Sequence, residues 1–219
     1  MDSDVPMHRT RIKICGLTRE ADVDAAVAAG ADALGFVLYA RSARHVSLGR
    51  AQSLVRRLPP FVTPVLLFVN ATADEVLAAA VAIPHAVLQF HGDEDPAACE
   101  SSGRPYIRAV RMAAEVDLLN FAVLFHHAQA LLLDAHVEGY GGGGKVFDWS
   151  QIPASVPLPV VLSGGLNPAN VTDGVLSVRP WAVDVSSGVE IGKGVKDALL
   201  MRRFCQAVRV ADETLARRS

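Results

Sequence analysis

The sequence predicts an α/β fold, a single (β/α)8 TIM barrel that extends over residues 11–219. Eight short apolar runs alternate with segments of helical character, and the ends of these runs recur about every 20–31 residues, the period of a βα unit in a parallel sheet. No Pro/Ser-rich linker or break in composition divides the chain, and 51% of its 219 residues are hydrophobic, enough for a large core. A doubly wound sheet is the alternative fold for the same alternation.

The N-terminal half of the chain shows the alternation of strands and helices from its first apolar run. The run RIKIC at 11–15 is rich in β-forming residues, and the helical spacing of 18–30 ends at Gly30, a residue type that commonly follows helices. Strands are then expected at 31–39, 63–70, 85–92 and 105–112, and helices at 48–58, 73–82 and 95–102.

The C-terminal half continues the pattern with one irregular crossover. Strands are expected at 128–134, 158–165 and 180–188, and helices at 167–178 and 195–210. The stretch 113–125 has helical character without a clear boundary. The sixth crossover is the least regular, because only the segment FDWSQI lies beyond a long glycine loop.

Composition and charge argue against several classes of protein. The formal net charge of −2 gives no basic footprint, so no nucleic-acid partner is expected. No apolar run approaches the ~20 residues of a membrane span, and residues 1–10, predicted to be a flexible N-terminal extension, lack the apolar core of a secretory signal. Cys15, Cys99 and Cys205 are widely separated, which argues against a disulfide framework or a zinc site and favours a reducing cytoplasm.

In a barrel of this kind, the chemistry is carried by side chains at the C-terminal ends of the strands. The candidates at those ends are Cys15, Arg41, Arg44, Asn70, His91, Arg111, Asp134, the segment 163–165 and the segment 184–188. Cys15 and Asp134 are the candidate catalytic pair, because a thiol and a carboxyl at one mouth can take opposite roles in acid/base catalysis. The alternatives are a small buried apolar residue for Cys15 and a carboxylate that caps a loop amide for Asp134.

Two glycine-containing turns after the last two strands predict a phosphate site. LSGGLNP contains Gly164 and Gly165, and DVSSGVE contains Ser186, Ser187 and Gly188. Glycines let backbone N–H groups approach an anion, and barrel enzymes often bind phosphate with the loops after strands seven and eight. Ordinary turns built from small residues are the alternative.

Three other features of the strand ends allow more than one interpretation. Asp184, beside the Ser-Ser-Gly turn, is expected to fix the loop around the substrate. His91 is placed with the substrate-binding residues; with the acidic run 93–95 it could form a metal cluster, but HGDEDP also has the pattern of a turn and helix start, so no metal is expected. Arg41 and Arg44 suit recognition of a carboxylate or phosphate, with a solvated surface as the alternative.

The run GYGGGGKVFDW at 139–149 fits the nucleotide phosphate loop G-x-x-x-x-G-K up to its last position. A nucleotide loop is not expected, because Val146 stands where Ser or Thr would hold Mg²⁺ and no long helix follows. Consecutive glycines lose much backbone entropy when they are fixed, which favours a mobile flap. The predicted lid comprises Gly141, Gly142, Gly143, Gly144 and Lys145.

Seven segments together resemble the phosphoribosylanthranilate isomerase family. In chain order they are KICGLT (13–18), GADALGFVLY (30–39) with RSARHVS behind it, QFHGDE (89–94), LLLD (131–134), GGGGKVFDW (141–149), LSGGLNPANV (162–171), and DVSSGVE with GVKD (184–197). The likeness spans about residues 11–208, and KICG and DVSSGVE are specific when both occur in one chain.

The resemblance implies a (β/α)8 enzyme of tryptophan biosynthesis that needs no cofactor. Its reaction would be the Amadori rearrangement of N-(5-phosphoribosyl)anthranilate to 1-(2-carboxyphenylamino)-1-deoxyribulose 5-phosphate. By the same resemblance, Asp134 would be the general acid that opens the furanose ring, and Cys15 the general base that removes the C2 proton. Arg44 matches the position that binds the anthranilate carboxylate, the two glycine turns would hold the phosphate, and the glycine run would cover the site.

The chain departs from the family pattern most clearly at Gly143, where relatives have Ser or Thr; this predicts a more mobile lid. The expected partner is a small phosphorylated substrate, and the family implies a monomer or homodimer.

Three alternative functions share the fold. The first is a histidine-pathway aminoaldose isomerase, an enzyme that has Asp in place of Cys15 and carries a second phosphate cradle. The others are a metal-dependent pentose-phosphate epimerase and a phosphate-binding barrel without catalysis.

Overall fold

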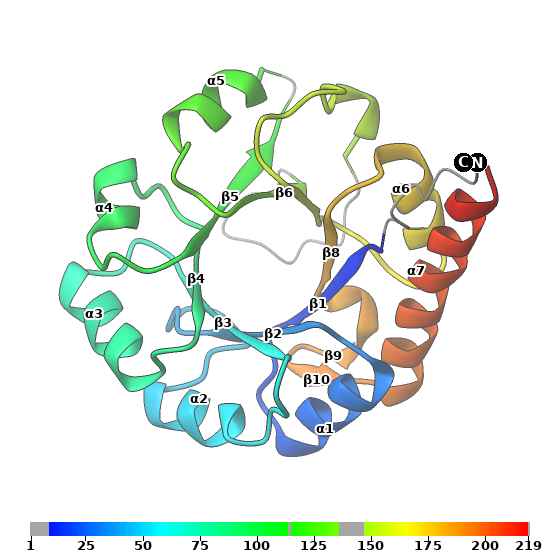
Figure 1. Ribbon diagram of the computed structural model, residues 1–219. Coiled ribbons are helices and arrows are strands. Elements are labelled where there is room, and N and C mark those ends of the chain that lie inside the picture. The colour runs from blue at the N-terminus through cyan, green and yellow to red at the C-terminus, as the bar shows by residue number, and fades with distance from the viewer. Residues whose placement is uncertain (1–8, 114, 136–146, 219) are drawn as a thin grey trace.

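The computed structural model describes residues 9–113, 115–135 and 147–218. Eight strands form a closed barrel of parallel neighbours in the order of the chain, and β1 pairs with both β2 and β8. Figure 1 looks along the barrel and shows the helices as an outer ring around the strands. The predicted (β/α)8 barrel is therefore confirmed, and a doubly wound sheet, which would have two open edges, is excluded.

The elements follow the predicted alternation, and each of the eight expected strands is present. The barrel strands are β1 (Arg11–Cys15), β2 (Ala33–Val37), β3 (Thr63–Phe68), β4 (Val87–Phe90), β5 (Tyr106–Met112), β6 (Ala130–Ala135), β7 (Val160–Leu162) and β8 (Ala182–Val185). The helices are α1 (Glu20–Ala29), α2 (Leu48–Val55), α3 (Ala73–Ala82), α4 (Pro96–Glu100), α5 (Leu118–Leu124), α6 (Val171–Val178) and α7 (Ala198–Arg218).

Alternate residues of each strand face the helices and the barrel axis, which gives two apolar layers. Outward-facing side chains such as Phe36, Leu66 and Phe90 are at most 1% exposed and belong to the main core between the barrel and its helices. A separate inner cluster comprises Ala109, Ala130, Leu132, Val161 and Ala182. Further along the same strands the inward residues are polar, and they begin the mouth of the barrel.

Local capping explains where several helices begin and end. The Ser47 side chain accepts a hydrogen bond from an N–H in the first turn of α2, and Thr72 and Glu75 form a reciprocal capping box at the start of α3. Gly30 follows α1 with a φ of 89°, a left-handed conformation that glycine adopts without strain, as the sequence predicts.

The segment before the last helix differs from the prediction. An antiparallel hairpin of β9 (Glu190–Gly192) and β10 (Val195–Lys196) precedes α7, so this helix begins at Ala198 and not at residue 195, and it continues to residue 218. Gly194, with a φ of 78°, turns the chain between the two strands. The Asp197 side chain accepts a hydrogen bond from an N–H in the first turn of α7, which fixes the start of that helix.

The sixth crossover contains the 3-10 helix Trp149–Gln151 beyond the glycine run, in agreement with the absence of a long helical pattern there. The glycine run and most of the predicted N-terminal extension lie outside the described residues, so both remain predictions. Thr10 is buried, and its Oγ1 donates to Asp212 Oδ1 at 2.7 Å. Among the described helices, none is both long and apolar enough to cross a membrane.

Candidate active site

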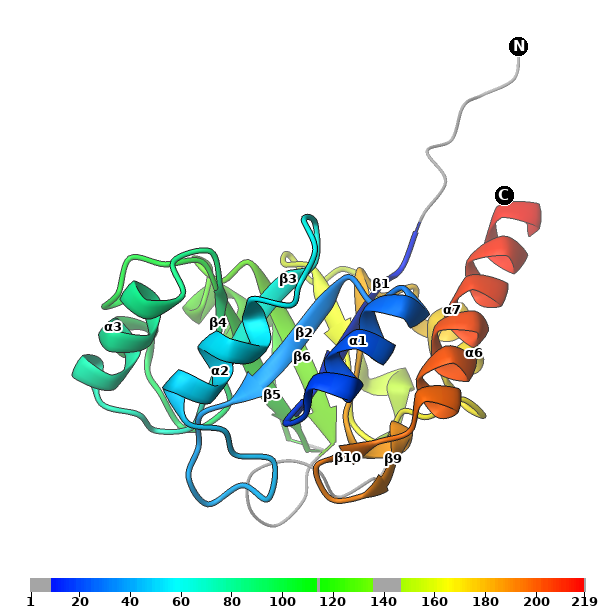
Figure 2. The same ribbon diagram turned by 90° about the horizontal axis from the view of Figure 1, so that it is seen from below.

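The C-terminal strand ends gather at one end of the barrel. Figure 2, a side view, shows the β9–β10 hairpin and the connection between β2 and α2 at this end. Cys15 ends β1, while Asp134 and Asp184 lie near the ends of β6 and β8, and His91 and Ser163 directly follow β4 and β7. The parallel barrel therefore brings the predicted strand-end residues to one mouth, as the sequence led us to expect.

Cys15 lies on the inner wall of this mouth. It is 5% exposed and packs in an apolar cluster with Val37, Leu67 and Val69. Gly35 on the neighbouring strand leaves room for the thiol, because a Cβ at that position would lie 2.7 Å from Cys15 Sγ. Burial raises the pKa of the Cys15 thiol, whereas the nearby Lys13 cation acts in the opposite direction and favours the thiolate.

A buried ion pair lies beside Cys15. Lys13 precedes Cys15 by two positions on β1 and so shares its inward face, and Lys13 Nζ lies 2.7 Å from Asp184 Oδ1. Ser163 Oγ donates to the other carboxylate oxygen of Asp184 at 3.2 Å. Burial alone would lower the pKa of Lys13, but Asp184 and Cys15 outweigh it, so the pKa is raised and Lys13 remains an ammonium. Lys13 was not among the residues predicted from the sequence, although its spacing from Cys15 was a usable signal.

Asp134 is paired with His91. Asp134 Oδ2 lies 3.1 Å from His91 Nε2, and Asp134 Oδ1 accepts a hydrogen bond of 3.0 Å from the Ala135 N–H. On the far side of the imidazole, His91 Nδ1 lies 3.0 Å from Nε2 of Gln89, a side chain with no exposed surface. These contacts connect β4 to β6 and hold the Asp134 carboxyl in one orientation. His91 was predicted as a substrate-binding residue, but its contact with Asp134 was not predicted from the sequence.

Arg44 is held by an acidic residue that the sequence analysis did not single out. Its Nε and Nη2 donate to the two carboxylate oxygens of Glu190 at 2.8 and 2.7 Å, a bidentate arrangement. Lys196 Nζ lies 2.8 Å from the same carboxylate. A Cβ at Gly16 would lie 2.4 Å from Arg44 Cδ, so the glycine after Cys15 lets the arginine pack against the end of β1.

The loops after β7 and β8 are packed closely against their neighbours. A Cβ at Gly188 would lie 1.9 Å from the Leu166 carbonyl oxygen, and a Cβ at Gly164 would lie 2.4 Å from the Ala135 nitrogen. Gly164 and Gly165 also have φ values of 76° and 69°, which only glycine adopts readily. The predicted phosphate residues thus lie on two contacting loops: Gly164, Gly165, Ser186, Ser187 and Gly188.

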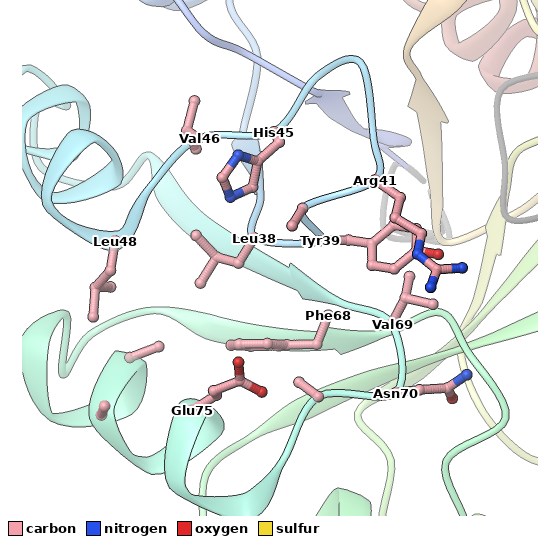
Figure 3. Close-up of a pocket in the computed structure, with 14 residues that line it drawn as sticks. Leu38, Tyr39, Arg41, His45, Val46, Leu48, Phe68, Val69, Asn70 and Glu75 are labelled. Carbon is pink, nitrogen blue, oxygen red and sulfur yellow. The ribbon is translucent and has the colours of Figure 1, made fainter.

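A cavity of about 410 Å³ opens beside β2 and β3. Its polar lining comprises Tyr39, Arg41, His45, Asn70 and Glu75, drawn in Figure 3. Tyr39 also packs against the apolar cluster that contains Cys15, so the cavity adjoins the thiol side of the mouth. Arg41 therefore lies in different surroundings from Arg44.

The remaining candidates have other environments. Cys99 and Cys205 are completely buried, and burial raises their pKa values to about 12 and about 11. His126 and His127 are both exposed. In the part of the chain that the structure describes, no group of three or more His, Cys, Asp or Glu side chains could hold a metal ion. The predicted lid, Gly141 to Lys145, lies outside that part and remains a prediction.

Known proteins share this sequence and this fold. The family model described as N-(5'phosphoribosyl)anthranilate (PRA) isomerase matches residues 12–207. A relative from Leptothrix cholodnii, named N-(5'-phosphoribosyl)anthranilate isomerase, is 74% identical over 204 residues, which cover 93% of each chain.

Two solved structures extend the likeness to three dimensions. The crystal structure of phosphoribosyl anthranilate isomerase from Thermotoga maritima has a TM-score of 0.84 at 40% identity, over 92% of this chain and 99% of that chain. A crystal structure of phosphoribosyl anthranilate isomerase in complex with reduced 1-(o-carboxyphenylamino)-1-deoxyribulose 5-phosphate has a TM-score of 0.81 at 37% identity, with the same coverage. The chain therefore belongs to the N-(5'-phosphoribosyl)anthranilate isomerase family.

Proposed function

We propose that this chain catalyses the Amadori rearrangement of N-(5-phosphoribosyl)anthranilate in tryptophan biosynthesis, with Asp134 as general acid and Cys15 as general base. The observation that carries the proposal is the placement of a carboxyl and a thiol at the ends of β6 and β1, each with its own charged or hydrogen-bonding neighbours. Membership of the family supports the choice of substrate, and a solved relative binds a reduced form of the proposed product.

Asp134 is suited to the first step, in which the furanose ring opens. Its proton passes to the ring oxygen as the C1–O bond breaks, and the nitrogen lone pair forms the C1=N bond of the Schiff base. His91 and the Ala135 N–H orient the carboxyl for this transfer. A carboxyl placed in this way contributes roughly 10²–10⁴ in rate.

Cys15 is suited to the second step. Its thiolate removes the C2 proton, the C–H electrons form the C1=C2 bond, and the C1=N electrons return to nitrogen to give an enolamine. The enolamine then becomes the ketone as the C2 hydroxyl loses its proton and C1 gains one. Because burial raises the pKa of the Cys15 thiol, the thiolate depends on a nearby cation, and Lys13 supplies it.

The ends of the substrate have separate binding groups in this proposal. The loops with Gly164, Gly165, Ser186, Ser187 and Gly188 offer backbone N–H groups to the phosphate. Arg44 offers the part of its guanidinium that Glu190 does not occupy to the anthranilate carboxylate. The lid over Asp134, a cytoplasmic location and a monomeric or homodimeric state remain predictions.

The direct test is an assay of the purified protein with N-(5-phosphoribosyl)anthranilate, in which loss of substrate fluorescence reports turnover, with EDTA present. We expect full activity in EDTA. Folded protein without turnover would contradict the proposal, and inhibition by EDTA would favour a metal-dependent epimerase.

The roles of the two residues are tested with Cys15→Ser and Asp134→Asn. Each variant should lose turnover by roughly 10²-fold or more, while affinity for a product analogue stays within about threefold, because neither change removes the phosphate or carboxylate contacts. Near-full activity in either variant would refute the role assigned to that residue.

A further inference from the structure

The contact between Asp134 and His91 belongs to a longer buried chain. Gln89 lies two residues before His91 on the inward face of β4, and its side chain has no exposed surface. Gln89 Nε2 lies 3.0 Å from His91 Nδ1, and His91 Nε2 lies 3.1 Å from Asp134 Oδ2. Among the described residues, Gln89 Oε1 has no hydrogen-bond partner, so the amide is held from one side.

A neutral imidazole has one nitrogen that donates and one that accepts, so the partner of one nitrogen decides what the other can do. In the structure, Nε2 of the Gln89 amide faces His91 Nδ1 and donates to it. The ring proton of His91 is then on its own Nε2, which donates to an ionised Asp134. If the amide turns by half a rotation, Oε1 accepts from Nδ1–H and Nε2 becomes an acceptor. In that arrangement the Asp134 carboxyl keeps its proton and donates it to His91.

These two hydrogen-bond directions between His91 and Asp134 correspond to the two protonation forms that Asp134 must take as a general acid. The ligand-free structure has the arrangement of the carboxylate. In the substrate complex, before ring opening, the carboxyl must carry a proton, and after ring opening it is again a carboxylate. Glutamine can serve both forms, because its amide offers a donor and an acceptor of almost the same shape. Glutamate could only accept, and methionine could do neither with useful strength. Since Gln89 is fully buried beside Nδ1, a substitution at this position changes the partner of that nitrogen directly.

We propose that Gln89 is a positioning residue that acts through His91: its amide sets which imidazole nitrogen carries the proton, and so sets whether Asp134 meets a donor or an acceptor. The inference rests on the proposed role of Asp134 as the general acid. It adds a residue that does not touch the substrate and that sequence reasoning did not identify.

The test is ¹⁵N NMR of the histidine rings in the ligand-free protein, with His91 assigned through the His91→Asn variant. In the wild-type protein we expect Nδ1 to be unprotonated and Nε2 to carry the proton. In Gln89→Glu, whose carboxylate only accepts, Nδ1 should become protonated. Gln129→Glu, an exposed position outside the mouth, introduces the same charge change and should leave the His91 signals as they are. A protonated Nδ1 in the wild type, or an unchanged Nδ1 in Gln89→Glu, would overturn the proposal.

Kinetics provide the second readout. Gln89→Met and Gln89→Glu should each lower kcat by about tenfold or more with KM within about threefold, a part of the ~10²–10⁴ that a general acid contributes. A change in KM alone, or unchanged kinetics in both variants, would also overturn it. The NMR result does not require turnover, so a failure of this inference is distinguishable from a failure of the proposed function, which Asp134→Asn tests separately.

Discussion

Lys13 Nζ lies 2.7 Å from Asp184 Oδ1, and the two side chains are only 4% and 7% exposed. The pair joins the first barrel strand to the last, because Lys13 and Asp184 are register partners across β1 and β8. Burial has the largest effect on the pKa of Cys15 and raises it. Lys13 lowers this pKa by more than Asp184 raises it. The pair therefore favours the thiolate while remaining electrically balanced in the barrel interior.

Removal of the Lys13 charge should impair the proposed base. In Lys13→Met the pKa of the Cys15 thiol should rise further, so that kcat at neutral pH falls by roughly 10²-fold and activity returns only at higher pH. The pH dependence of Cys15 alkylation by iodoacetamide, followed by mass spectrometry of the Cys15 peptide, would report the thiol directly. An alkylation profile identical to that of the wild type would contradict this prediction.

The same substitution should destabilise the fold, because it leaves Asp184 buried without its cation, at a cost of ~3–5 kcal/mol in the free energy of unfolding. The double variant Lys13→Met, Asp184→Leu is the matched control. It should recover most of the stability, since apolar replacement of a buried ion pair is often neutral. Its kcat should recover only in part, because the lost effect of Lys13 on the thiol is the larger of the two.

Gly35 should matter for the position of the thiol. In Gly35→Ala the new Cβ would lie 2.7 Å from Cys15 Sγ, so the sulfur must move or the strands must separate. We expect a loss of ~1–3 kcal/mol in the free energy of unfolding, typical of overpacking, and a fall in kcat that is larger than any change in KM. Gly49→Ala is the control, because a Cβ there meets nothing within 4 Å and lies on α2. Equal effects of the two substitutions would exclude the steric explanation.

The carboxylate of Glu190 should make stability depend on acid pH. Burial would raise its pKa, but Arg44 and Lys196 outweigh burial and hold the pKa below the ordinary value of 4.5. A lowered folded-state pKa contributes stability that is present above pH 4.5 and is lost as the pH falls through the folded-state value. Urea unfolding from pH 7 downward should show this loss in the wild type.

Glu190→Gln provides the comparison for that measurement. We expect the variant to be about 1–3 kcal/mol less stable at neutral pH, because it replaces charge-assisted hydrogen bonds by neutral ones. Below pH 4.5 its difference from the wild type should shrink, since Glu190 takes up a proton first in the unfolded wild-type chain and, at the lower folded-state pKa, in the folded protein as well. A difference that stays constant with pH would show that the charge of Glu190 is not the cause.

The sequence predicted the barrel and the strand-end candidates because both depend on local patterns. Apolar periodicity located the eight strands, and parallel topology then required Cys15 and Asp134 to be at the same end. The hairpin before α7 escaped prediction, because its strands of three and two residues are too short to show a period and the helical pattern of 195–210 runs across β10.

The partners within the site could not be read from the sequence in the same way. Lys13 and Asp184 are 171 positions apart, and their contact depends on the register with which the barrel closes. The contact of Arg44 with Glu190 similarly depends on the hairpin. Residues two positions before a strand-end candidate, such as Lys13 and Gln89, share its face, and this rule would have identified both.

Gly188 should be essential for phosphate binding, although its role is to bring two loops together. In Gly188→Ala the new Cβ would lie 1.9 Å from the Leu166 carbonyl oxygen, so the loops after β7 and β8 must separate. Separation would spread the backbone N–H groups that are proposed to surround the phosphate, and we expect KM to rise by about tenfold or more, equivalent to ~1.4 kcal/mol of binding. Competitive inhibition by inorganic phosphate should weaken by a similar factor, which distinguishes a phosphate effect from an effect on the anthranilate end.

Gly192→Ala in the hairpin is the matched control, since its Cβ would meet nothing within 4 Å. It should leave KM and the inhibition by phosphate unchanged. A Gly188→Ala variant that binds inorganic phosphate as the wild type does would place the phosphate elsewhere in the mouth.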